Sequence, residues 1–216
     1  LVQTRLVSPS QAAILELISL VRKQASTEDI EEVLKKDAGL AFNLMRLINS
    51  SGFGLTREIT SFRQAVMLLG LKKLFRWGAL LLTLSRNGGP PPAVGSTAVV
   101  RGRLMELLAL DLFDQEMADE AFVVGIFSLL DAMLGLPMES ALHLITVPAP
   151  VSNALLRREG PLGALLQLAQ ACENSDEATF ETAAAALSLT SAQINGAHLK
   201  ALAWADRIGE SAPQQP

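Results

Sequence analysis

The spacing of apolar residues along the chain is the feature that most constrains how it can fold. Ile14, Leu17, Ile18 and Val21 recur every three or four positions, and residues 40–48 repeat this spacing with leucine and isoleucine. That period gathers apolar side chains on one face of an α-helix, whereas a half-buried strand would alternate at every second position. The chain is therefore predicted to pack helical faces against one another.

Polar motifs at the ends of these apolar segments indicate where helices begin, because a short polar side chain can accept a hydrogen bond from a free backbone N–H group of the first turn. The helix that follows Ser61 is expected to end at Gly70, and a second helix to follow it directly. The capping motifs are Ser8–Gln11, Ser61–Gln64, Asn174 with Glu177, and Thr190 with Gln193. Later helices are expected at residues 96–112, 116–135, 138–146, 161–173, 176–188 and 191–208.

The composition argues against a β-sheet. Tyrosine is absent and aromatic residues make up 5% of the chain, whereas strands favour aromatic and β-branched side chains. The segment Asn87–Pro92 holds two glycines and three prolines, which break a helical pattern. We predict an all-α fold without sheet, in two packed helical lobes that divide near residues 86–95. Residues 1–26 are expected to form a helix that packs on the bundle, 27–208 the main domain, and 209–216 a disordered tail.

Charge and cysteine content exclude several classes of protein. The net charge of −4 provides no positive field for nucleic acid or an anionic membrane. The longest apolar run, Ala121–Leu130, is far shorter than the ~20 residues that span a bilayer. The single cysteine, Cys172, fits a reducing compartment, so we expect a cytoplasmic protein without nucleic-acid partners or membrane insertion. Because the first residue is Leu1 and not methionine, we also expect the chain to be part of a longer protein.

Two stretches of the sequence resemble the HDOD domain, an output domain related to the HD phosphohydrolases. The first stretch has a helix that ends in Asn49-Ser50, then an Ile-x-Ser turn at Ser61, and a helix that ends in Leu-Gly at Gly70, with Trp77 beyond it. The second stretch, Ala121–Asp131, is similar to the HDOD half of two-domain EAL–HDOD signalling proteins. The resemblance extends over residues 27–205 and implies an HD-like helical bundle.

The resemblance also implies a function. HDOD domains are regarded as non-catalytic output or scaffold modules, and an EAL domain binds or hydrolyses cyclic di-GMP. The chain is therefore expected to be an interaction module, not an enzyme, that regulates or scaffolds an attached EAL domain or another protein. No cofactor is expected. Self-association is the simplest form of binding, most often as a twofold homodimer.

The residues that would hold a metal in a related hydrolase are replaced in this sequence. HD hydrolases bind metals through several His and Asp residues, including an adjacent His-Asp pair, and alignment at Gly125 puts Ser128 and Leu129 at the pair's positions. A hydroxyl and an isobutyl group cannot replace an imidazole and a carboxylate as metal ligands. The helix that would supply an earlier histidine carries Arg101 and Arg103. The alternative is a divergent metal-dependent phosphohydrolase with other ligands, although the two histidines, His143 and His198, lie far apart in sequence.

Asp131 is expected to pair with one of these arginines. It follows Ser128 by one helical turn, so both would lie on the same face of a helix that is otherwise apolar. A lone carboxylate there would be costly, and the planar guanidinium of Arg101 or Arg103 suits it. The alternative is that Asp131 points into solvent.

Two further sets of polar residues are candidates. Asn49 is expected to be structural, because an amide at a helix end can satisfy free carbonyl groups or bridge to the next helix. A cationic cluster could contact an acidic partner or a phosphate, but a solvated face with no binding role is the favoured interpretation. The cluster comprises Arg63, Lys72, Lys73 and Arg76.

Overall fold

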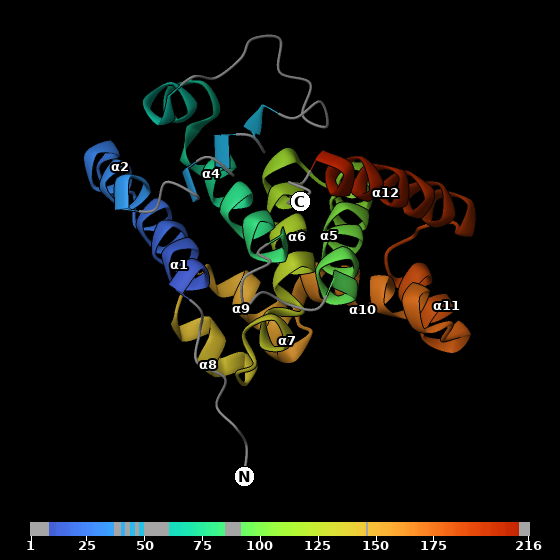
Figure 1. The fold of residues 1–216 in the computed structure, drawn as a ribbon. Coiled ribbons are helices and arrows are strands. Elements are labelled where there is room, and N and C mark those ends of the chain that lie inside the picture. The colour runs from blue at the N-terminus through green and yellow to red at the C-terminus, as the bar shows by residue number, and fades with distance from the viewer. Residues whose placement is uncertain are drawn as a thin grey trace. The chain divides into compact units, whose positions relative to one another are not determined.

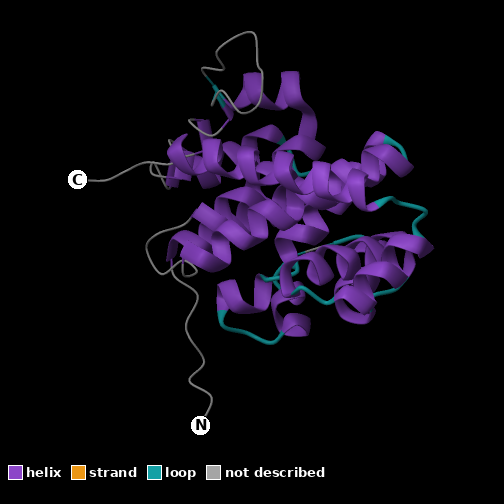
Figure 2. Ribbon diagram, turned by 90° about the vertical axis from the view of Figure 1, so that its right-hand side faces the viewer, coloured by secondary structure: helices purple, strands orange, loops and turns teal. Residues whose placement is uncertain are grey.

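The computed structural model describes residues 9–36, 40–41, 44–45, 48–49, 61–84, 92–145 and 147–211. Every regular element within these residues is an α-helix, and none of them is a strand (Figures 1 and 2). The predicted all-α fold is thus confirmed. No helix in this part of the chain is both long and apolar enough to cross a membrane.

The helices are labelled as in Figure 1. They are α1 (Pro9–Arg22), α2 (Thr27–Lys36), α4 (Phe62–Leu84), α5 (Pro92–Leu112), α6 (Gln115–Phe127), α7 (Leu130–Leu134), α8 (Met138–His143), α9 (Ala149–Arg157), α10 (Gly160–Asn174), α11 (Glu177–Ala186) and α12 (Ser191–Ser211).

The chain divides into two compact units. Unit 1 comprises Leu1–Gly95, Asp131–Thr146 and Arg207–Pro216, and unit 2 comprises Ser96–Leu130 and Val147–Asp206. The first division falls beside the glycine- and proline-rich segment. The sequence pattern did not indicate that α7 and α8, which follow the buried helix α6, belong to unit 1 with the N-terminal helices.

In unit 1, α1 packs against α2 and α4 through the apolar stripe that the sequence predicts. Ile14, Leu17, Ile18 and Val21 are all buried. Gly78 makes the close approach of α1 to α4 feasible, because a Cβ there would lie 2.7 Å from Cγ1 of Ile18. The side-chain amide of Gln11, also on α1, donates a hydrogen bond of 3.2 Å to the carbonyl of Met133 in α7.

The motif from Ser61 to Gly70 folds as its sequence predicts. The backbone N–H of Gln64 donates to Ser61 Oγ at 3.2 Å, which caps the start of α4. Gly70 interrupts α4 with a φ of 75° and ψ of 164°, a conformation that L-amino acids with side chains rarely adopt. The polypeptide therefore resumes a helix after Gly70 in a new direction.

In unit 2, α6 is the central helix. Its residues Ala121–Phe127 are all buried, and α9 and α10 both pack against it. The uninterrupted apolar run in the sequence is explained by this burial on all sides, since a surface helix would keep a polar face. α10 also packs against α9 and α11.

Some boundaries differ from the sequence-based expectations. The predicted helix over 116–135 is two helices, α6 and α7, and α9 was not predicted at all. Asp176, not Asn174, caps α11, with its carboxylate accepting from the N–H of Thr179 at 3.1 Å. The predicted cap of α12 is confirmed, since the N–H of Gln193 donates to Thr190 Oγ1 at 3.3 Å. α12 continues to Ser211, so residues 209–211 are helical and not part of a disordered tail.

Candidate functional site

Two glycines bring the arginine-bearing helix α5 into contact with α6. A Cβ on Gly125 would lie 2.5 Å from the Cα of Gly102 and 2.6 Å from its backbone nitrogen. Real Cβ atoms essentially never approach so closely, so the two helices cross with their backbones in direct contact. This crossing sets Arg101, the residue before Gly102, beside Ser128, which lies one turn after Gly125.

The guanidinium of Arg101 lies at the end of α6. Its side chain is 6% exposed, and Nη1 donates a hydrogen bond of 2.6 Å to Ser128 Oγ. The hydroxyl of Ser128 in turn donates to the carbonyl of Gly125 at 2.6 Å. Ser128 is thus fixed by its own helix, as an interior serine usually is, and offers its oxygen to the arginine.

Glu173, near the end of α10, accepts from two further donors of Arg101. Nε of the arginine donates to Oε1 at 2.8 Å, and Nη2 donates to Oε2 at 2.5 Å. This bidentate geometry is the strongest form of the arginine–carboxylate pair. The side chain of Glu173 is 20% exposed, so both charges are largely removed from water and each depends on the other for compensation.

The expected partnership of Asp131 with an arginine is wrong. Arg101 pairs with Glu173, and Arg103 pairs with Glu106 at 2.6 Å. The carboxylate of Asp131 accepts a hydrogen bond of 2.8 Å from the N–H of Ala132. The expectation required one continuous helix through Ser128, but α6 ends at Phe127 and Asp131 belongs to the first turn of α7.

Arg103 occupies a second, more aromatic environment in unit 2. Its Cζ lies 5.4 Å from the ring centre of Trp204 in α12, within the range of a cation–π contact. Trp204 also meets Phe122 of α6 edge to face, with centroids 6.0 Å apart. Glu106, the ionic partner of Arg103, is itself buried. These contacts connect α5, α6 and α12.

Residues of the described segments do not form a group of three or more His, Cys, Asp and Glu that could hold a metal ion. His143 is exposed and His198 is half-buried. Leu129 is half-buried too. The buried polar group beside Ser128 is a guanidinium, which is a cation and has no lone pair to offer a metal.

Cys172 precedes Glu173 on α10 and is half-buried. Burial raises the pKa of its thiol, and the neighbouring carboxylate of Glu173 raises it further. The protonated thiol is therefore the favoured form at neutral pH, as expected for a cysteine whose role is packing.

The cationic cluster is divided by the break at Gly70. Arg63, before the break, forms ion pairs with Glu28 at 3.1 Å and Glu31 at 3.6 Å, both on α2. Beyond it, Lys72 and Lys73 are exposed, Arg76 is half-buried and Trp77 is buried. Asn49 is half-buried and its N–H donates to the carbonyl of Met45 at 3.0 Å. Ser50 lies outside the described residues.

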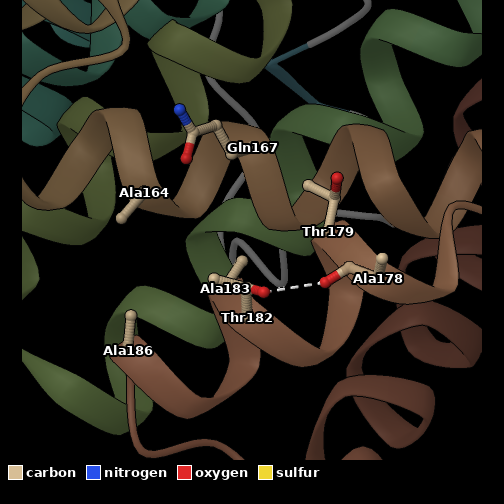
Figure 3. A pocket seen from close by; sticks show the side chains of 7 residues that line it. All are labelled: Ala164, Gln167, Ala178, Thr179, Thr182, Ala183 and Ala186. Carbon is tan, nitrogen blue, oxygen red and sulfur yellow. Dashed lines mark hydrogen bonds between the residues drawn. The ribbon is translucent and has the colours of Figure 1, made fainter.

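A shallow groove of about 310 Å³ lies between α10 and α11 (Figure 3). Its walls are mostly apolar, and Thr182 on its α11 side donates a hydrogen bond of 2.8 Å to the carbonyl of Ala178. The sequence gives no motif for it beyond an excess of alanine and threonine. The lining residues are Ala164, Gln167, Ala178, Thr179, Thr182, Ala183 and Ala186.

Two curated proteins are similar to this chain over much of its length. The cyclic di-GMP phosphodiesterase CdgJ of Vibrio cholerae is 29% identical over 177 residues, which cover 82% of this chain and 41% of CdgJ. The uncharacterized protein YuxH of Bacillus subtilis is 28% identical over 163 residues, 74% of this chain and 40% of YuxH. The chain thus spans well under half the length of either relative. No solved structure matches it.

Residues 8–130 match the HDOD domain family. The matched segment contains the crossing of Gly102 and Gly125 and both Arg101 and Ser128, whereas Glu173 lies beyond it. The match begins at residue 8, whereas the sequence motifs placed the start of the HDOD resemblance at residue 27. Because the match covers more than half of the chain, this protein belongs to the HDOD domain family.

Proposed function

We propose that this chain is a non-catalytic interaction module of cyclic di-GMP signalling. The observation that carries the proposal is the Arg101 guanidinium, buried between Ser128 and Glu173. We infer from the resemblance at Gly125 that Ser128 stands where the related hydrolases have the histidine of their His-Asp pair. A permanent cation at that position would repel a divalent metal ion, and its bidentate pair with Glu173 occupies a carboxylate that could otherwise serve as a ligand.

The interactions of unit 2 suit a scaffold. Arg101 connects α5, α6 and α10 through hydrogen bonds, and Arg103 with Trp204 adds α12. An arrangement held by paired charges and close helix crossings presents defined surfaces, which is what recognition of another protein requires. The name of the relative CdgJ places that protein in cyclic di-GMP turnover. We infer that the present chain regulates or scaffolds an EAL-type domain or another protein of such a system in the cytoplasm.

The experiment measures metal content and hydrolysis by the purified chain. We expect no stoichiometric Mn or Fe by elemental analysis, and no hydrolysis of cyclic di-GMP with Mn²⁺ or Mg²⁺ added. The same preparation is then titrated into an active EAL-domain phosphodiesterase, and a saturable change in its rate is expected. Arg101→Met serves as a comparison, since it removes the cation while leaving Ser128 in place.

Metal-dependent turnover that a chelator abolishes would show the alternative, a divergent phosphohydrolase. An EAL-domain rate that is unchanged at saturating concentrations of the chain would remove the regulatory part of the proposal.

A further inference from the structure

The helix α12 carries two stripes of residues at helical spacing, one buried and one exposed with two leucines at its centre. The inner stripe is buried and includes Trp204, which contacts Phe122 and Arg103. Its residues are Ile194, Ala197, Ala201 and Trp204, at intervals of three, four and three positions. This spacing is that of one face of an α-helix.

The outer stripe lies on the opposite side of α12 and is exposed along its whole length. Leu199 is 69% exposed and Leu202 is 43% exposed, although both are large apolar side chains. The stripe comprises Ala192, Asn195, Leu199, Leu202 and Asp206. Its intervals of three, four, three and four positions repeat the heptad spacing of helices that pair side by side.

We propose that this outer stripe is a docking surface for a second copy of the same chain, with the two α12 helices antiparallel about a twofold axis. Each interval of three positions in the stripe has a first and a last residue. In an antiparallel pair, the first residue of an interval on one helix faces the last residue of an interval on the other helix. Leu199 then lies against Leu202 of the partner subunit, and Leu202 against the partner's Leu199. One step outward, Asn195 lies against Asp206 of the partner subunit, once at each end.

The polar residues at the two ends of the stripe favour a second copy of this chain over a different protein as the binding partner. The side-chain amide of Asn195 can donate a hydrogen bond to a carboxylate, and Asp206 supplies one at the facing position. A parallel pair would instead set Asp206 against the partner's Asp206, and like charges in contact repel.

The dimer is expected to be weak. Stable protein interfaces bury roughly 800 Å² on each partner, and two heptads of a single helix provide less. The proposal deepens the proposed function, because it gives the interaction module one surface and one partner. Its tests measure assembly, whereas the tests of the proposed function measure metal and hydrolysis, so either can fail without the other.

Sedimentation velocity over a wide range of concentrations tests the interface. We expect a reversible monomer–dimer equilibrium of the chain that Leu199→Glu and Leu202→Glu each weaken by at least about tenfold, as for a central apolar contact. Leu156→Glu on α9 is the matched control, because Leu156 is 40% exposed but lies outside the stripe. Asn195→Lys should tighten the dimer by opposing a cation to Asp206. Circular dichroism confirms that each variant is folded.

Disulfide trapping tests the direction of the pair. In a Cys172→Ser background, the single variants Leu199→Cys and Leu202→Cys are mixed and oxidised, and the products are identified by mass spectrometry. Antiparallel pairing predicts that disulfides between positions 199 and 202 exceed those between like positions. A chain that stays monomeric at the highest concentration would overturn the proposal and leave the stripe to a different protein. A dimer that tolerates both glutamates, or that traps like positions preferentially, would overturn it equally.

Discussion

Arg101 and Glu173, 72 positions apart in the sequence, form a bidentate ion pair inside unit 2. The pair joins α5 to α10, and the bond from Arg101 to Ser128 adds α6. Three helices thus meet at a single guanidinium. Sequence patterns alone give its two partners different interpretations. They suggest that Ser128 replaces a metal ligand, and that Glu173 is an ordinary charged residue near the end of a helix.

Removal of the cation should strongly destabilise the fold. Arg101→Met leaves the carboxylate of Glu173 largely buried without a partner, and breaking a buried pair in this way typically costs about 3–5 kcal/mol. Urea denaturation measures the change in the free energy of unfolding. The matched control is Arg63→Met, because Arg63 pairs with Glu28 while both side chains are more than half exposed. Exposed pairs contribute only about 0–1 kcal/mol.

A double variant measures the contribution of the ion pair to stability apart from the contributions that each side chain makes with its other neighbours. Replacement of both Arg101 and Glu173 by methionine removes both charges, so we expect it to be less destabilised than the sum of the two single variants. Strict additivity of the two losses would show that the ion pair makes no specific contribution to stability.

The crossing of α5 and α6 should not accept a side chain. Gly125→Ala would bring a methyl group to 2.5 Å from the Cα of Gly102, which forces the helices apart and moves Arg101 from Ser128. We expect a loss of about 1–3 kcal/mol or more, in the range of overpacked cores. Gly196→Ala is the control, because a Cβ there meets no atom within 4 Å, and alanine should stabilise the helix by roughly 0.5–1 kcal/mol. Equal thermal stability of the two variants would contradict this account.

The local elements of the fold could be predicted from the sequence because their causes are local. Periodic apolar residues give the helices, Gly70 gives the break in α4, and the Thr190–Gln193 pair gives the cap of α12. α9 escaped prediction because it is short and begins beside two prolines, which indicate a loop, whereas Pro148 directly precedes the helix and Pro150 lies in its first turn. Proline is tolerated there because the first N–H groups of a helix have no intrahelical partner.

The centre of the candidate site could be predicted only in part. The resemblance to the HD hydrolases points to Arg101 and Ser128 as replacements at a lost metal site, and the two residues are in contact. The pairing of Glu173 could not be predicted because it depends on how α10 lies beside α5, which no spacing in the sequence encodes. Asp131 was chosen instead on the assumption of an unbroken helix, and the end of α6 at Phe127 removes that assumption.

Cys172 should react slowly and only at high pH. Burial and the Glu173 carboxylate raise the pKa of the thiol above its ordinary value of 9.0, and only the thiolate is nucleophilic. The rate of alkylation by iodoacetamide, followed by mass spectrometry across pH, should therefore reach half its maximum above pH 9.0. Because this is the single cysteine of the chain, the urea-unfolded protein is a direct control. A folded protein whose profile coincides with the unfolded one would disprove the shift.

Acid should weaken the start of α11 through Asp176. Hydrogen bonds from the side chain and the backbone N–H of Thr179 lower the pKa of this carboxyl below its ordinary value of 3.8. A group with a lowered pKa in the folded state stabilises it above its unfolded pKa, and that contribution is lost as the pH falls through the folded value. Hydrogen exchange at the Thr179 amide should therefore show protection at neutral pH that declines as the pH drops below 3.8.

Asp176→Asn provides the matched control for this cap. Asparagine keeps an acceptor oxygen for the N–H of Thr179 but does not titrate, and it is as good a capping residue as aspartate. In this variant the protection of the Thr179 amide should be nearly independent of pH over the same range, once intrinsic exchange rates are corrected for. If both proteins lost protection of the Thr179 amide equally as the pH fell, another group would be responsible for the acid sensitivity, because the asparagine of the variant does not titrate.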